Sequence, residues 1–230
     1  MSLRPSLPAA APNHGVPGLV RVGENLQRGL PAVAICTLAL AAGLALAGLF
    51  PDQALAWTAE HGPVETVTVI AYALTCGIAL LAWPRVGAVA ALVALLALLM
   101  ALREVDAHAA FTRFGIFSSR LYFRPDVPLA EKLGAAGVVL GLGFLLVAAI
   151  RSAWPRLVAQ GGRVGISLGA LFLFAILLKQ MDALPRQLMA LGAPLSPEAL
   201  ALSKAVEETG EAFLPVLLLL ALRQAARRAG

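Results

Sequence analysis

The sequence predicts an all-α polytopic membrane protein, a bundle of six transmembrane helices. The first observation behind this prediction is composition: 60% of the 230 residues are hydrophobic and 13% are charged. The mean hydropathy is +0.83. A soluble domain carries about 25% charged residues, so most of this chain must face lipid or other apolar helices.

The second observation is a set of six apolar stretches that approach the ~20 residues needed to cross a hydrocarbon core. They are 30–50, 63–83, 86–102, 133–150, 165–179 and 198–222, with the third to fifth on the short side. The chain is therefore divided into a disordered or interfacial leader at 1–29, one transmembrane domain at 30–223 with a long outer loop at 103–132, and a basic tail at 224–230.

The distribution of lysine and arginine along the sequence predicts that both termini lie in the cytoplasm. With that orientation the inner segments hold ten basic residues and one acid, Glu24, whereas the outer segments hold eight basic residues and twelve acids. Pro84 and Arg85 between the second and third stretches fit a tight cytoplasmic turn, and the tail is basic. The net charge of +5 then describes a cytoplasmic face that meets anionic lipid, not a nucleic-acid binder. The expected location is a bacterial-type inner membrane, with the acidic site facing the periplasm or exterior.

Two stripes of small residues predict close helix packing. Gly137 and Gly141 share a face of the fourth stretch, and Ala39, Gly43 and Ala47 share a face of the first. Packing within one chain is the favoured interpretation. A homodimer through the Gly137/Gly141 face is the alternative.

The acidic residues on the predicted outer side are the main functional signal, because a carboxylate near hydrocarbon is costly. Glu65 lies about one turn inside the second helix, which Pro63 begins. Its charge would suit the helix macrodipole if water reaches it. A buried Glu65 would need another explanation.

The third helix ends in a dense polar run from Arg103 to His108. If the helix continues through this run, Glu104 and His108 lie one turn apart on one face, and Asp106 points away from them. Such a pair can hold a metal ion, or the carboxylate can fix the imidazole tautomer. A solvated helix end with an Arg103–Glu104 ion pair is the simpler interpretation.

The sixth stretch is the hardest to explain as solvated charge. Its Glu207 and Glu211 share a face, Glu208 lies close to Glu211, and Lys204 can reach Glu207 or Glu208. Counted back from Arg223, both Glu207 and Glu211 fall within the hydrocarbon depth. Three carboxylates with one lysine leave negative charge that protons, a metal ion or a basic residue of a neighbouring helix must offset.

Ionisable groups therefore gather at the outer ends of the second, third, fifth and sixth helices, where the fifth contributes Lys179 and Asp182 as a pair. This convergence predicts one outward-facing cavity. Carboxylate and imidazole groups suit zinc, manganese or iron. The candidate metal ligands are Glu65, Glu104, His108, Asp182, Glu207 and Glu211, with His61 near them.

The long outer loop interleaves aromatic residues with Arg113, Arg120 and Arg124. Such a segment can lie along the membrane and hold an anionic head group, although an ordinary aromatic belt would look the same. The candidate substrate-binding residues are Arg103, Arg113, Arg120, Arg124, Lys179 and Lys204.

These features predict a metal-dependent enzyme, a hydrolase or lipid-modifying enzyme, acting on a lipid or lipid-linked anionic substrate with a metal-bound water as nucleophile. The candidate catalytic residues are Glu65, Glu104, Asp106, His108 and Glu208. One alternative is a proton- or cation-coupled transporter that uses the same acids as a relay. Another is an accessory subunit whose cavity binds a partner helix.

Overall fold

The computed structural model describes residues 17–59, 61–159 and 162–227, and helices make up most of them. Within these ranges there are six long helices: α1 (Pro17–Leu49), α3 (Pro63–Val86), α4 (Ala88–Glu104), α7 (Leu129–Ala159), α8 (Arg163–Ala190) and α9 (Pro197–Ala226). Three short helices are α2 (Pro51–Trp57), α5 (Ala107–Ala110) and α6 (Ser119–Phe123).

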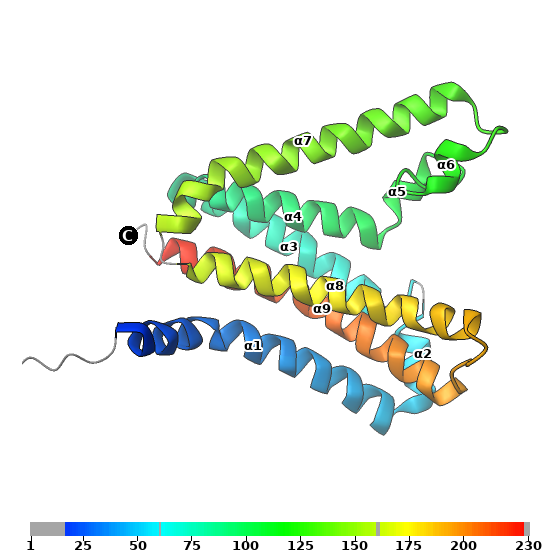
Figure 1. Ribbon diagram of the computed structural model, residues 1–230, viewed down its shortest axis with the longest axis horizontal. Helices are drawn as coiled ribbons and strands as arrows, with labels where there is room; N and C mark the ends of the chain where they lie inside the picture. The colour runs from blue at the N-terminus through cyan, green and yellow to red at the C-terminus, as the bar shows by residue number, and fades with distance from the viewer. Residues whose placement is uncertain (1–16, 60, 160–161, 228–230) are drawn as a thin grey trace, which may run out of the picture.

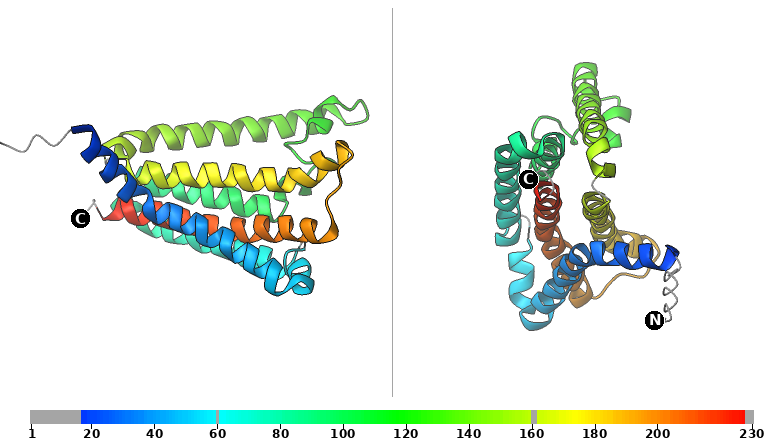
Figure 2. Two further views of the ribbon diagram at one scale, coloured as in Figure 1. Left: turned by 60° about the horizontal axis from the view of Figure 1, so that its bottom comes forward. Right: turned by 90° about the vertical axis from the view of Figure 1, so that its left-hand side faces the viewer.

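The long helices run side by side, and the short helices all lie at one end of the bundle (Figure 1). We call this end, which also holds the connection between α8 and α9, the cavity end. The tight turn between α3 and α4, the end of α7 and the start of α8 lie at the opposite end, near the end of α9 (Figure 2).

Four of the described helices contain segments long and apolar enough to cross a membrane, which fits a multi-pass helical membrane protein. They are Gly29–Leu49, Pro63–Val86, Leu129–Val158 and Arg163–Ala190. Large apolar side chains such as Leu81, Leu140 and Phe144 are exposed on their outer faces. Apolar surface on this scale is the kind that faces lipid. Helix α4 is shorter, with 17 residues, and α9 is interrupted by charged residues.

Helix α9 is the centre of the bundle, in contact with α1, α3, α4 and α8. Two glycines let its neighbours approach closely. A Cβ on Gly43 of α1 would lie 2.7 Å from the Cα of Val206, and one on Gly210 of α9 would collide with the side chain of Leu178. The predicted stripe on the first helix is thus a packing face at Gly43, and it meets the acidic part of α9.

Helix α7 lies at the edge of the bundle, where it contacts α4 and makes only minor contact with α8. Its four glycines, Gly134, Gly137, Gly141 and Gly143, would each accept a Cβ with no neighbour within 4 Å. The favoured interpretation of this stripe as a packing face within the chain was therefore wrong at these positions. The homodimer through Gly137 and Gly141 stays a prediction.

Several helix boundaries differ from those expected. Helix α1 already begins at Pro17, within the leader predicted for 1–29, while residues 1–16 lie outside the described part of the chain. Pro84 and Arg85 belong to the last turn of α3, and the turn falls at Gly87. Gly87 has φ 65°, a conformation that glycine adopts without a steric cost. The Arg156 Nη1 of α7 donates a hydrogen bond to the Val86 carbonyl at 2.7 Å, which ties α7 to this turn.

Candidate functional site

A cavity of about 1390 Å³ opens at the cavity end, between the loop after α4 and helices α4, α7, α8 and α9. Eight carboxylates and four basic side chains lie among the described residues that line it. The acids are Glu65, Glu104, Asp106, Glu131, Asp182, Glu207, Glu208 and Glu211, and the basic residues are Arg103, Lys179, Arg186 and Lys204. The predicted convergence of four helices on one cavity thus agrees with the structure.

The cavity also has an apolar wall, which the sequence alone did not reveal. Helix α7 supplies Val138, Val139, Leu142 and Leu146, and α4 supplies Leu99 and Met100. These residues follow the helices from the polar side chains toward the middle of the bundle. One cavity therefore offers both charged groups and a hydrocarbon surface.

Helix α9 contributes the most deeply buried acids. Glu207 and Glu211 are each 4% exposed and share a face one helical turn apart. Lys204 reaches both neighbouring acids, with its Nζ 2.5 Å from Glu208 Oε1 and 3.5 Å from Glu207 Oε2. The sequence predicted either contact for Lys204, and the structure contains both.

Arg103 connects α4 to α9. Its Nη2 donates to Glu211 Oε1 at 2.5 Å, and its Nη1 lies 3.5 Å from Glu104 Oε1. The side chains of the two acids are 6% and 5% exposed, whereas that of Arg103 is 40% exposed. One partly solvated guanidinium thus faces two buried carboxylates.

The pairing of Glu104 with His108 on one continuous helix was a wrong prediction. Helix α4 ends at Glu104, and Asp106 adopts the left-handed conformation with φ 49° before the short helix α5 begins. Aspartate enters this conformation more readily than most residues. The chain therefore changes direction between the two positions. The side chain of His108 lies outside the described residues.

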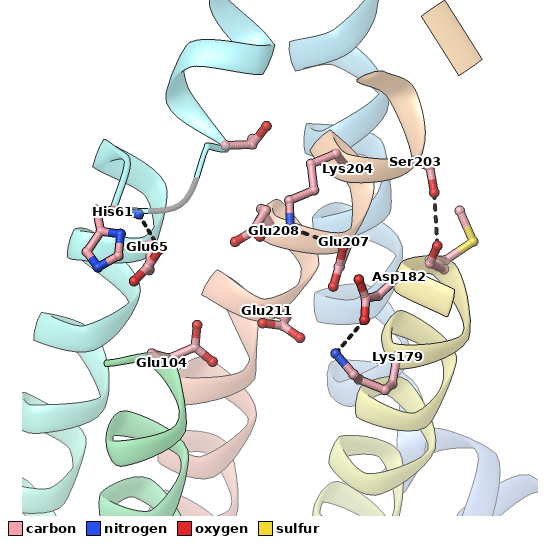
Figure 3. Close-up of polar contacts among 12 residues, drawn as sticks. His61, Glu65, Glu104, Lys179, Asp182, Ser203, Lys204, Glu207, Glu208 and Glu211 are labelled. Carbon is pink, nitrogen blue, oxygen red and sulfur yellow. Dashed lines mark hydrogen bonds and ion pairs between the residues drawn. The ribbon is translucent and has the colours of Figure 1, made fainter. Parts of the chain in front are cut away.

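Helix α8 contributes a charge cluster that is largely satisfied within one helix. Asp182 Oδ2 lies 2.6 Å from Lys179 Nζ and 3.1 Å from Arg186 Nη2. The predicted Lys179–Asp182 pair is present, so Lys179 is engaged on its own helix. Figure 3 shows this pair beside α9, where the Ser203 hydroxyl donates to the Met181 carbonyl.

Glu65 of α3 is partly buried and accepts a hydrogen bond from the backbone N–H of His61 at 2.7 Å. This contact links the residue before the N-cap of α3 to the first turn of the helix, where an acid also suits the helix macrodipole. Both residues also line the cavity. In Figure 3 the carboxylates of Glu65, Glu104, Glu208 and Glu211 point toward a common space, and they come from three helices.

The loop arginines Arg113, Arg120 and Arg124 are not among the residues that line the cavity, although the Arg113 Nε lies 3.9 Å from Oε2 of the lining residue Glu131. Arg124 donates to Asp126 at 2.9 Å, and this hydrogen bond lowers the pKa of the Asp126 carboxyl. Arg124 also lies 5.1 Å above the ring centre of Phe114. The Arg113 backbone N–H donates to Glu131. These contacts organise the loop and tie it to the start of α7.

The sequence did not predict two residues that line the cavity and one buried polar residue of α3. Arg186 and Glu131 line the cavity and carried no signal beyond a charge near a helix end. Tyr72 of α3 is fully buried, and its hydroxyl has no hydrogen-bond partner among the described residues. Tyr72 follows Glu65 and Thr68 on one helix face, so the spacing of polar residues along α3 was the signal that could have found it.

No three described histidine, cysteine or acidic side chains come close enough together to hold one metal ion. The carboxylates face a common space, but across a wider gap than a bare ion bridges. The predicted zinc, manganese or iron site includes His108, whose side chain is not described, and it stays a prediction.

Fold and site together define a helical, multi-pass membrane protein with a carboxylate-lined cavity at one end of its bundle. No known protein family, characterised protein or solved structure matches the chain. Its function must therefore be argued from the cavity.

Proposed function

We propose that this protein is a six-span inner-membrane enzyme that binds a lipid or lipid-linked molecule in the cavity and acts on its head group at the outer face. The observation that carries the proposal is the division of the cavity into two surfaces. Charged side chains gather at the cavity end, and aliphatic side chains of α4 and α7 continue inward from them. An amphipathic molecule is the ligand with this arrangement of polar and apolar parts.

The position of α7 supports entry from the membrane. Helix α7 touches α4 and barely contacts α8, so few residues close the cavity between α7 and α8. A lipid could enter from the side with its chain along Leu142 and Leu146. A cavity for a water-soluble substrate would need only the polar end.

The carboxylates supply the chemistry of the proposal. Glu104 and Glu208 line the cavity and can accept or donate a proton at a bound head group. Glu211 and Arg103 hold each other in place, which gives the site a fixed geometry. A hydrolysis or group transfer on the head group is the class of reaction that such groups catalyse.

The transporter alternative has less support. A relay would need ionisable groups on both sides of the bundle, yet the inner wall of the cavity consists of aliphatic residues such as Leu99, Leu142 and Leu146. Toward the end of the bundle opposite the cavity, the buried Ser167 of α8 donates a hydrogen bond to Gln224 of α9 at 2.9 Å. Both side chains are neutral, so this contact joins two helices and adds no ionisable group to a relay.

A photoreactive phospholipid tests the cavity. With a diazirine on its acyl chain and in vesicles holding the full chain, we expect crosslinks on residues 139–146. Leu142→Trp fills the cavity wall and should reduce this crosslinking severalfold. Leu140→Trp is the matched control, because Leu140 lies two residues away and is 73% exposed. Equal crosslinking of both variants and the parent protein would refute a lipid cavity at this place.

Impermeant thiol labelling tests the topology. In a chain with Cys36→Ser and Cys76→Ser, we expect Phe123→Cys and Leu191→Cys to react from outside intact cells, and Arg85→Cys to react only after lysis. All three positions are exposed. Labelling of Arg85→Cys from outside would overturn the six-span arrangement with cytoplasmic termini.

A further inference from the structure

The charge around the common space of Figure 3 is unbalanced, and this imbalance points to a class of ligand. Each basic residue of the described lining already contacts an acid: Arg103 faces Glu104 and Glu211, Lys204 faces Glu207 and Glu208, and Asp182 takes both Lys179 and Arg186. The two deepest basic residues thus serve four carboxylates. A surplus of buried negative charge is costly until a positive group offsets it.

Glu104 is the carboxylate that these contacts satisfy least. Its side chain is 5% exposed and lines the cavity, and its Oε1 has no hydrogen-bond partner among the described residues. The nearest cation, Arg103, is 3.5 Å away and donates its hydrogen bond to Glu211 instead. A buried oxygen without a donor costs free energy that a bound donor can recover.

The spacing of the carboxylates favours an organic cation over a metal ion. Glu65, Glu104 and Glu208 point into the common space from α3, the end of α4 and α9, respectively. No three described acids come close enough to share one metal ion. An ammonium group is larger and carries three donors that point in different directions, so it can reach carboxylates on separate helices.

We propose that the head group bound at this site carries a positive charge, as an ammonium or guanidinium group, and that Glu104 is the residue that binds it. The inference rests on the proposed function, since the cavity must first accept an amphipathic molecule. It replaces the anionic head group expected from the loop arginines, because Arg113, Arg120 and Arg124 do not line the cavity.

Three amphiphiles with the same chain and different charge test this inference: hexadecylamine, hexadecanol and hexadecyl phosphate. Binding is measured by titration into the full chain in zwitterionic nanodiscs, with empty nanodiscs subtracted. We expect hexadecylamine to bind about tenfold more tightly than hexadecanol, the gain that one charge-assisted hydrogen bond predicts. Glu104→Gln should remove this difference and leave hexadecanol binding within about twofold, since the alcohol carries no positive charge and the amide of the variant side chain still offers an oxygen acceptor for its hydroxyl.

Two further variants keep the result interpretable. Asp126→Asn removes an exposed acid outside the cavity and should leave all three affinities unchanged. Glu104→Asp keeps the charge and should retain part of the preference for the amine. Thermal unfolding of each variant shows whether it is folded.

The outcomes separate the two proposals. If all three probes bind equally, or hexadecyl phosphate binds best, a cationic head group is refuted and the lipid cavity stands. If none binds above empty nanodiscs, the lipid cavity itself is refuted. If hexadecylamine keeps its advantage in folded Glu104→Gln, Glu104 is not its binding residue.

Discussion

Replacement of Arg103 tests the most informative contact in the site. Arg103→Met leaves Glu211 and Glu104, with side chains 6% and 5% exposed, without their cation. Breaking a fully buried ion pair costs about 3–5 kcal/mol, and we expect about 2 kcal/mol here because 40% of the Arg103 side chain is exposed. Glu211→Gln should cost only about 1 kcal/mol, since Arg103 keeps both Glu104 and solvent.

The double variant Arg103→Met/Glu211→Gln isolates the pair. If the two changes acted independently, their costs would add to about 3 kcal/mol; we expect about 1.5 kcal/mol, because Glu211 no longer leaves an unpaired charge. The measurement is thermal unfolding in a mild detergent, where 1 kcal/mol corresponds to about 2–4 °C for a chain of this size. Arg103→Met should therefore lower the Tm by about 4–8 °C.

The exposed pair of Arg124 and Asp126 provides the control. Its atoms are 2.9 Å apart, and both side chains are about half exposed. Arg124→Gln should change stability by less than ~0.5 kcal/mol. A Tm of Arg103→Met within 2 °C of the parent protein, or strictly additive costs in the double variant, would show that Arg103 and Glu211 do not form a buried pair.

Two other substitutions test how the helices are packed. Gly43→Ala places a Cβ 2.7 Å from the Cα of Val206 and should destabilise the bundle by about 1–3 kcal/mol. Gly48→Ala on the same helix is the control, because its Cβ meets nothing within 4 Å and should change stability by less than ~0.5 kcal/mol. Equal melting temperatures of the two variants would contradict the close contact of α1 with α9. Tyr72→Phe removes a buried hydroxyl without a partner among the described residues and should leave stability unchanged or raise it by about 1 kcal/mol. A clear fall in its Tm would show that the hydroxyl has a partner after all.

The sequence predicts what depends on local periodicity. Apolar length predicts the six long helices, and spacings of three and four residues predict the contacts of Lys179 with Asp182 and of Lys204 with Glu207 and Glu208, because these partners lie on one helix. All of these residues line the cavity, as was expected for the acids.

Local periodicity does not predict contacts between different helices. Arg103 and Glu211 are 108 residues apart, and only the packing of α4 on α9 brings them together. The break after Glu104 depends on the left-handed conformation of Asp106, which a sequence permits without requiring. The sequence also could not predict that the glycines of α7 have no neighbouring helix against them, since a glycine stripe has the same sequence whether a helix or lipid covers it.

The central place of α9 has a consequence for how the chain assembles. Helix α9 follows the other described long helices in the chain, and in the proposed six-span arrangement it brings Glu207, Glu208 and Glu211 into a membrane where a carboxylate near the middle of a lone helix costs about 2.5–3.5 kcal/mol. Lys204 is part of α9 itself, but Arg103 belongs to α4 and Gly43, on which α9 packs, belongs to α1. Both helices come earlier in the chain. In the proposed six-span arrangement, insertion of α9 therefore favours a bundle in which α1 and α4 are already in place.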